Sequence, residues 1–205
     1  MAPAMTKLPL AATLLAALAA PALAQQTPVE LPGPRVAVSD FVPIALDTSA
    51  GRIVIALDRL HAPVTSANFL HYVDTHRFDG ETIYRAMPYG SGGLIQGGIR
   101  TDARKLYPPI AFEGTNTTGL SNTAGTIAMA AAAPGTAQAD FFIMTVDIKQ
   151  FDGPSGFAAF GKVVEGMDVV KAILKSPVSP DKGEGAMKGQ ILDPPVKILK
   201  VSRVK

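Results

Sequence analysis

The sequence predicts a mainly β protein in which many short strands form a barrel or a sandwich, with two helices added. Several short runs of apolar and β-branched residues are separated by clusters of Gly and Pro, which is typical of strands joined by turns. Only two segments have the i, i+3, i+4 spacing of an amphipathic helix. Strands and helices do not alternate along the chain, so a barrel or sandwich is favoured over a doubly wound sheet.

The N-terminal segment, residues 1–24, has the features of a secretory signal peptide. Lys7 supplies a positive charge, Leu8 to Ala20 is an apolar run of mostly Ala and Leu, and Ala22-Leu23-Ala24 matches an A-x-A cleavage site. The apolar run is too short to span a bilayer comfortably, and no stop-transfer pattern follows it. We therefore expect a periplasmic or secreted protein that begins at Gln25 and has no membrane segment after cleavage.

The composition of the remaining chain excludes several functional classes. Of 19 Lys and Arg and 17 Asp and Glu, only Lys7 lies in the signal peptide, which leaves 18 basic against 17 acidic residues. This near neutrality indicates no patch for nucleic acid or for an anionic membrane surface. The sequence has no Cys, so the exported fold must be stable without disulfides. About 180 residues are enough for one domain with a real core.

The predicted elements follow one another with turns at Gly and Pro. Residues 25–40 are rich in Pro and polar residues and are predicted to form a flexible tether, so the folded domain is expected over 41–205. One helix is predicted over Leu60 to Asp74, with Pro63 in its first turn, and a second over Gly166 to Lys175. Strands are predicted at Phe41–Asp47, Gly51–Asp58, Thr82–Met87, Leu94–Gly97, Thr126–Ala131, Phe141–Thr145, Phe157–Val164 and Val196–Val204.

Several motifs that carry chemistry in other proteins are incomplete here. The stretch GSGGLIQGG lacks the Lys-Ser/Thr pair of a phosphate-binding loop and leads into no helix. His61, His71 and His76 lack the i, i+4 spacing of a zinc helix. No Ser lies in a nucleophile-elbow context, and the acidic residues near strands lie at strand ends, where Asp usually completes turns. We therefore expect no cofactor, no metal and no hydrolase chemistry.

Two segments, Phe78 to Gly98 and Gly125 to Thr145, carry most of the functional information. They contain FDGETIYRAMP, LIQGG, GTIAMA and DFFI, and FGKVVEGMDVV follows. In this order and spacing, the segments closely resemble the cyclophilin-type peptidyl-prolyl cis/trans isomerases, especially the exported bacterial branch, over Ile44 to Val204. The resemblance implies a closed eight-stranded antiparallel barrel capped by two α-helices, with a proline-binding groove on its outer face.

The resemblance also implies site residues and an activity. Arg85 matches the catalytic arginine of the family, Gln96 the glutamine that supports it, and Phe142 the aromatic floor of the proline pocket. The other matching positions are Leu94, Phe151 and Phe157 on the apolar wall, Ala130 and Ala131 on the strand edge that holds the peptide, and Asp140 beside the groove. The implied function is X-Pro isomerisation during folding of exported proteins, with proline-containing polypeptides as partners. We expect a monomer.

One departure from the family pattern concerns the segment between the two polar residues. Arg85 and Gln96 are eleven residues apart, three more than is usual in the family, so GSGGL is expected to form a bulge or a longer loop. The pocket phenylalanine of the family then has no counterpart. Gly93 takes its place by spacing, and Tyr89 is a candidate to fill it in space. A catalytically weak proline-peptide binding module or chaperone on the same fold is therefore the alternative function.

Two further departures are substitutions near the groove. Asp140 replaces a glutamine, and its carboxylate could pair with Arg85 or favour basic substrates. Gln150 stands where animal relatives have the tryptophan that contacts cyclosporin, so weak cyclosporin binding is expected.

Without the resemblance, the main site residues have simpler interpretations. Phe141 and Phe142 must point to opposite faces of one strand, and periodicity alone does not decide which of them faces the core. Arg85 would be an ordinary outward-facing strand arginine. Gln96 is harder to explain in this way, because a polar side chain beside two glycines indicates a close approach of other groups.

Overall fold

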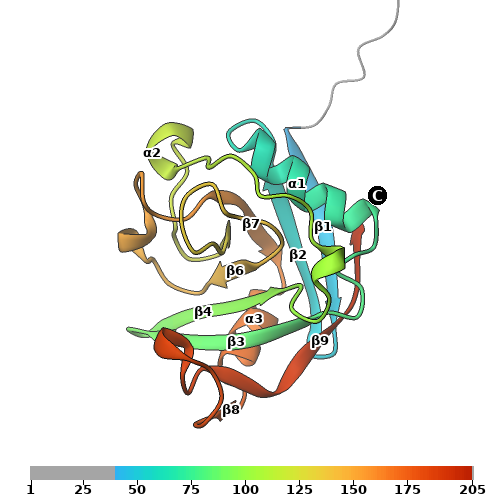
Figure 1. Cartoon of the computed structure of the whole chain (residues 1–205), viewed down its shortest axis with the longest axis vertical. Coiled ribbons are helices and arrows are strands. Elements are labelled where there is room, and N and C mark those ends of the chain that lie inside the picture. Colours follow the sequence, from blue (N-terminus) through green and yellow to red (C-terminus); the bar gives the residue numbers. More distant parts are fainter. Residues whose placement is uncertain (1–39, 205) are drawn as a thin grey trace, which may run out of the picture. The chain divides into compact units, whose positions relative to one another are not determined.

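Eight antiparallel strands close into a ring in the computed structural model, which describes residues 40–204 (Figure 1). Going round the ring, the strands are β1 (Phe41–Thr48), β2 (Gly51–Asp58), β7 (Ala159–Glu165), β5 (Thr126–Met129), β6 (Phe141–Met144), β4 (Gly92–Gly98), β3 (Thr82–Tyr89) and β9 (Ile191–Arg203), and β1 pairs with β9 to close it. A two-residue strand, β8 (Val178–Ser179), pairs with the start of β9. The expected closed eight-stranded barrel is confirmed.

The helices lie on opposite sides of the barrel, as Figure 1 shows for α1 (Pro63–Asp74) and α3 (Met167–Leu174). Helix α1 packs against β2, β7 and β9, whereas α3 packs against β2, β3 and β4. Both were expected from sequence. A one-turn helix, α2 (Thr115–Thr118), and three 3-10 turns, η1 (Ala103–Lys105), η2 (Lys149–Phe151) and η3 (Gly185–Met187), were not. Within residues 40–204, no helix has the length and apolar character needed to cross a bilayer. The predicted signal peptide and nearly all of the predicted tether lie outside the described residues.

Helix α1 begins at Pro63, three residues after the predicted start, because the preceding residues form a turn. The backbone N–H groups of Leu60 and His61 donate to Asp58 Oδ1 at 3.1 and 3.0 Å, which holds them outside the helix. The first free N–H groups of the helix donate to the carboxylate of Glu113, from Val64 at 3.0 Å and Thr65 at 2.7 Å. A distant acidic residue therefore stabilises the N-terminus of α1.

The barrel interior and the inner faces of both long helices form one apolar core. At its centre, Phe69 of α1 packs against Phe78, Phe141 and Phe160, with ring centroids 4.9, 5.5 and 5.4 Å apart. All four phenylalanines are 0 or 1% exposed. Because Phe141 faces this core, its neighbour Phe142 must face outward.

The β3–β4 hairpin corrects one expectation. The extra residues do not form a bulge or a loose loop: Tyr89 pairs with Gly92, so both strands continue to a turn at Gly90 and Ser91. The inserted residues therefore lengthen a regular hairpin. The irregularity lies instead between Ile83 and Arg85, and it shifts the register of β3 against both β4 and β9.

Candidate functional site

A row of residues crosses the outer face of four neighbouring strands. Arg85 of β3 pairs with Gln96 of β4, Gln96 pairs with Phe142 of β6, and Phe142 pairs with Ala128 of β5. Residues directly opposite each other in antiparallel strands share a face and lie within contact distance. The strand register thus places a cation, an amide and an aromatic ring side by side, although they are far apart in sequence.

The register shift in β3 puts two consecutive side chains on the same face. Tyr84 is the extra residue of a β-bulge, so Tyr84 and Arg85 together oppose Gln96. Gln96 contacts both: its Oε1 accepts a hydrogen bond from Arg85 Nη1 at 2.8 Å, and its Nε2 donates to the Tyr84 hydroxyl at 2.6 Å. Gln96 is 6% exposed, so both ends of a buried amide have partners.

A second glutamine, which sequence reasoning missed, holds the other edge of the arginine. Gln190 Oε1 accepts hydrogen bonds from Arg85 Nε at 2.9 Å and from Nη2 at 2.7 Å. Gln190 directly precedes β9, where Ile191 pairs with Arg85. Only the pairing of β3 with β9 brings Gln190 to the site, and no local sequence pattern marks it.

Asp140 does not pair with Arg85. Its Oδ2 accepts a hydrogen bond from the Tyr84 hydroxyl at 2.7 Å, and the guanidinium of Arg100 lies over the Tyr84 ring at 4.7 Å. Burial raises the pKa of Asp140, with Tyr84 and Arg100 acting in the opposite direction. Burial, and then the neighbouring Asp140, raise the pKa of Tyr84, which stays protonated and can donate. A preference for basic substrates stays a prediction.

The glycines beside Gln96 are explained by close packing between strands. A Cβ at Gly98, whose φ is +151°, would overlap Asp140 Oδ1, and a Cβ at Gly97 would lie 3.0 Å from the carbonyl oxygen of Thr82. The close approach inferred from the sequence is therefore made by neighbouring strands of the barrel.

At the Phe142 end of the row, the loop that carries Phe151 and Phe157 lies over the sheet. Phe142, 3% exposed, packs against Phe157 with ring centroids 5.0 Å apart and against Phe151 at 5.5 Å, and the last two rings are 4.7 Å apart. These rings, with Leu94, belong to an apolar cluster that is separate from the barrel core. Phe142 thus forms the floor of an outer apolar site, which answers the question that periodicity left open.

Asn122 fixes the loop that carries two of these rings. Its Nδ2 lies 2.9 Å from the Phe151 carbonyl oxygen and 3.2 Å from that of Phe157, and 2.9 Å from Asp152 Oδ1. The Asn122 carbonyl oxygen in turn accepts from the Ile148 N–H at 2.9 Å. Because Asn122 is fully buried, these bonds are shielded from water, and they set the position of the aromatic wall.

The polar and apolar halves open onto one groove of about 590 Å³. All nine residues that the sequence associated with the site line it: Arg85, Leu94, Gln96, Ala130, Ala131, Asp140, Phe142, Phe151 and Phe157. The lining also includes residues that were not expected, among them Tyr84, Met87, Arg100, Leu106 and Met187.

The lengthened hairpin does not fill this groove. None of residues 88–93 lines it, and the Tyr89 hydroxyl donates to Gln150 Oε1 at 2.7 Å on the exposed surface. A side chain at Gly93 is excluded, because a Cβ would overlap the Met87 carbonyl oxygen. Tyr89 therefore does not replace the missing phenylalanine. Met87, which pairs with Leu94 and lines the groove, supplies an apolar side chain there instead.

The strand edge expected to hold a peptide is only partly free. Strand β5 ends at Met129, two residues before the predicted end, and the Ala130 N–H donates to the Asp140 carbonyl oxygen at 2.8 Å. Within residues 40–204, no backbone hydrogen bond is formed by Ala131, which is partly exposed beside the groove. Ala131 is thus the better placed of the two to pair with an added chain.

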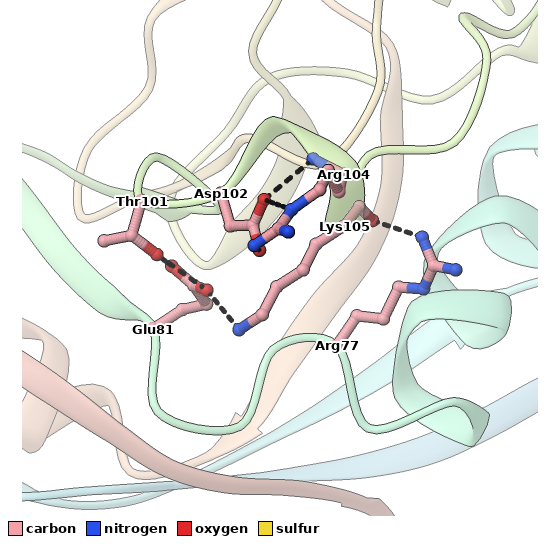
Figure 2. Close-up of polar contacts among 6 residues, drawn as sticks. All are labelled: Arg77, Glu81, Thr101, Asp102, Arg104 and Lys105. Atoms are coloured by element: carbon pink, nitrogen blue, oxygen red, sulfur yellow. Dashed lines mark hydrogen bonds and ion pairs between the residues drawn. The ribbon is translucent and has the colours of Figure 1, made fainter.

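The segment that carries Arg100 and Leu106 is tied to the barrel by a buried carboxylate (Figure 2). Glu81, 2% exposed, accepts from Lys105 Nζ at 2.7 Å and from Thr101 Oγ1 at 3.1 and 3.2 Å. Arg77 Nη1 donates to the Lys105 carbonyl oxygen at 2.6 Å. These bonds fix the backbone of the segment through which Arg100 and Leu106 line the groove.

The groove lining contains two guanidinium groups. Arg100 lies over the Tyr84 ring and acts on Asp140, whereas Arg85 stands in the row with Gln96 and Phe142. Burial lowers the pKa of Arg85, yet a guanidinium remains charged at any physiological pH. Its hydrogen-bond partners, Gln96 and Gln190, are neutral amides that orient the charge without offsetting it. Among residues 40–204 no cluster of His, Asp or Glu could hold a metal ion. The arrangement can hold an apolar ring next to a fixed donor of hydrogen bonds.

Comparison with known proteins identifies similar chains. A family model described as cyclophilin type peptidyl-prolyl cis-trans isomerase matches residues 42–203. A peptidyl-prolyl cis-trans isomerase of Acinetobacter baylyi is 35% identical over 165 residues, 77% of this chain and 83% of the relative. Peptidyl-prolyl cis-trans isomerase A of Dickeya dadantii is 37% identical over 147 residues, 68% of this chain and 75% of the relative.

A solved structure has the same fold. The crystal structure of a cyclophilin type peptidyl-prolyl cis-trans isomerase from Cryptosporidium parvum matches with a TM-score of 0.68 at 19% identity, covering 80% of this chain and 98% of that one. The structure of that protein in the presence of the dipeptide Ala-Pro matches with a TM-score of 0.67. At this identity the likeness concerns the fold alone.

Proposed function

The chain belongs to the cyclophilin-type peptidyl-prolyl cis-trans isomerases, and from this premise we propose that Arg85 and the groove beside it isomerise X-Pro bonds in exported proteins. The observation that carries the proposal is the fixed guanidinium of Arg85, held by two amides at the edge of an apolar groove. A groove floored by Phe142 suits a pyrrolidine ring, and the neighbouring cation suits the bond that rotates.

The chemistry needs few groups because no covalent bond breaks. Rotation about a peptide bond is opposed by a barrier of about 18–20 kcal/mol, since the nitrogen lone pair is delocalised into the carbonyl group. In the twisted transition state this pair is localised on the prolyl nitrogen, which can then accept a hydrogen bond. A donor that binds this twisted state better than either planar isomer lowers the barrier. Arg85 is placed to be that donor.

The hydrogen bonds of Arg85 leave it able to act on a substrate. A guanidinium has five N–H donors, and three are used here, one each on Nε, Nη1 and Nη2. One N–H on each terminal nitrogen remains for the substrate. No proton is transferred in this mechanism, so it needs no titrating side chain. Lowering the barrier by about 7 kcal/mol would accelerate exchange roughly 10⁵-fold.

The features that favoured a catalytically weak binding module do not disturb the arginine. The lengthened hairpin extends away from the groove, and Asp140 is bonded to Tyr84 instead of Arg85. Both observations support catalysis over binding alone. The binding-module alternative therefore has no specific observation in its favour.

We further propose that this protein works outside the cytoplasm as a member of the exported bacterial branch. Support comes from the signal-peptide pattern of residues 1–24 and from the bacterial origin of the relatives in Acinetobacter and Dickeya. Proline-containing polypeptides as substrates agree with the Ala-Pro dipeptide used with the Cryptosporidium protein. We also propose weak cyclosporin affinity, since an exposed glutamine, Gln150, stands at the expected tryptophan position. The expectation that the protein is a monomer stays a prediction.

Two measurements test the proposal. Exchange spectroscopy by NMR on a short X-Pro peptide should show cis/trans cross-peaks when the protein is added, and equal exchange with and without protein would reject the activity. For export, mass spectrometry of the protein from a periplasmic fraction should give a chain that starts at Gln25. An intact N-terminus in the cytoplasmic fraction would reject the export proposal and leave the activity untouched.

A further inference from the structure

We infer that Gln190 is a positioning residue for the isomerisation, and this inference rests on the proposed role of Arg85. Gln190 contributes a single oxygen, Oε1, which accepts from both Nε and Nη2 of Arg85 at 2.9 and 2.7 Å. Those two N–H groups lie on one edge of the planar guanidinium, so an acceptor that binds both fixes the plane as well as the position of the group.

The backbone of Gln190 is itself held against the strand that carries the arginine. Its carbonyl oxygen accepts from the Ala86 N–H at 2.9 Å, and its own N–H donates to the Met187 carbonyl oxygen at 3.1 Å. Ile191, the next residue, pairs with Arg85 in the β3–β9 ladder. Gln190 is thus placed by the neighbours of Arg85, and the distance between the two side chains is set by sheet geometry.

Gln190 and Gln96 bind the guanidinium from different sides. Gln96 Oε1 binds Nη1 alone at 2.8 Å, which leaves the group free to swing about that contact. The two bonds that Arg85 donates to Gln190 remove this freedom. Together the two amides leave one N–H on each terminal nitrogen, and these directions are fixed before a substrate binds. Preorganised donors need no reorganisation in the transition state, which is where they accelerate a reaction most.

The choice of an amide at this position also has an electrostatic reason. A carboxylate at position 190 would accept the same two bonds, but its negative charge would offset the cation that the twisted imide requires. The glutamine oxygen supplies the geometry without that charge. The segment before it, with Met187 in the groove lining, brings this amide to the rim of the groove.

The most informative variant is Gln190→Met, which keeps the length of the side chain and removes the acceptor oxygen. We expect kcat to fall about tenfold, the size of a lost hydrogen bond to a charged group, while KM changes less than about twofold. We expect the bond to Gln190 to protect the Arg85 Nε–H from exchange with water in the wild-type protein, so its NMR signal should broaden or disappear in the variant. The matched control is Lys188→Ala, an exposed residue of the same segment, which should leave kcat unchanged.

A double-mutant cycle separates positioning from general structural support. In an Arg85→Ala background, Gln190→Met should have no further effect on the residual exchange, because the guanidinium that Gln190 positions is already absent. An equal fold loss in both backgrounds, or a Gln190→Met enzyme within twofold of the wild type, would overturn this inference while leaving the proposed function standing. Absence of catalysis by the wild-type protein would overturn both. Circular dichroism of each variant establishes that the fold is retained.

Discussion

The two halves of the groove are built by different physical means. The polar half fixes Arg85 through directional hydrogen bonds that its guanidinium donates to Gln96 and Gln190, with distances of 2.7 to 2.9 Å. The apolar half is formed by packing of Phe142, Phe151 and Phe157, whose centroids are 4.7 to 5.5 Å apart. Hydrogen bonds define direction, whereas packing defines shape. We therefore expect damage to the polar half to lower kcat and damage to the apolar half to raise KM.

The largest effect is expected from Arg85→Ala. Removing a donor that acts only in the transition state should lower kcat roughly 10²- to 10³-fold, with little change in peptide affinity or thermal stability. Protease-coupled or NMR exchange assays measure the rate. Arg104→Ala, which removes an arginine whose side chain is 91% exposed, is the matched control and should behave as the wild type. A large rise in KM with kcat retained would place Arg85 in the binding half instead.

The next largest effect is expected from Asn122→Ala, which tests how the apolar half is held. The carbonyl groups of Phe151 and Phe157 would lose their shared donor, so the free energy of unfolding should fall by about 1–3 kcal/mol. The aromatic wall would loosen, and KM should rise while kcat at saturating peptide stays close to that of the wild type. Chemical denaturation and steady-state kinetics measure both quantities. A fall in kcat comparable to that of Arg85→Ala would contradict the expectation that the apolar half affects KM and not kcat.

A smaller effect is expected from Phe142→Leu, which keeps the floor apolar and removes its edge-on contact with Phe157. Losing an aromatic pair of this geometry should cost about 0.5–1.5 kcal/mol, seen as a few-fold to tenfold increase in KM. Leu199→Ala, at a residue that is 58% exposed, controls for the loss of an apolar side chain elsewhere. An unchanged KM would mean that the proline ring does not bind over Phe142.

The smallest effect is expected from Asp140→Asn, and it depends on pH. Burial raises the pKa of Asp140 in the folded state, so its ionised form is disfavoured there and the wild type loses stability as pH rises through that value. The asparagine variant should be more stable near neutral pH by about 1 kcal/mol or less, roughly 2–4 °C in Tm. Below the ordinary Asp pKa, about 3.9, this advantage should vanish. Thermal melts of both proteins across pH check the sign, and an advantage that grows in acid would contradict it.

The strands of the barrel and the central row of the site could be predicted from the sequence and its resemblance to a known family, whereas the order of the strands round the ring could not. Short apolar runs between Gly and Pro clusters marked every strand of the ring, and the resemblance of five ordered segments supplied the closure. Arg85, Gln96 and Phe142 stand in motifs that are local in sequence, so their meeting on one face followed once the barrel was assumed.

The other features of the site depend on the register between paired strands, which cannot be inferred from the sequence. The bulge that turns Tyr84 to the same face as Arg85 depends on pairing with two strands at once. The inserted residues near Gly93 could form a loop or lengthen a hairpin, and the tertiary fold selects the hairpin. Gln190 is brought to the site only by the pairing of β3 with a strand about one hundred residues away, and it stands in a segment with no periodic pattern.

We propose that the polar half of the groove acts on the barrier to rotation and not on peptide binding. Exchange spectroscopy of one X-Pro peptide with the Arg85→Ala variant, at a saturating concentration, distinguishes these two roles. We expect the peptide resonances to shift on titration as they do with the wild-type protein, while catalysed cis/trans exchange is largely lost. Exchange that persists near the wild-type rate in a variant that still binds the peptide would show that Arg85 does not act on the barrier.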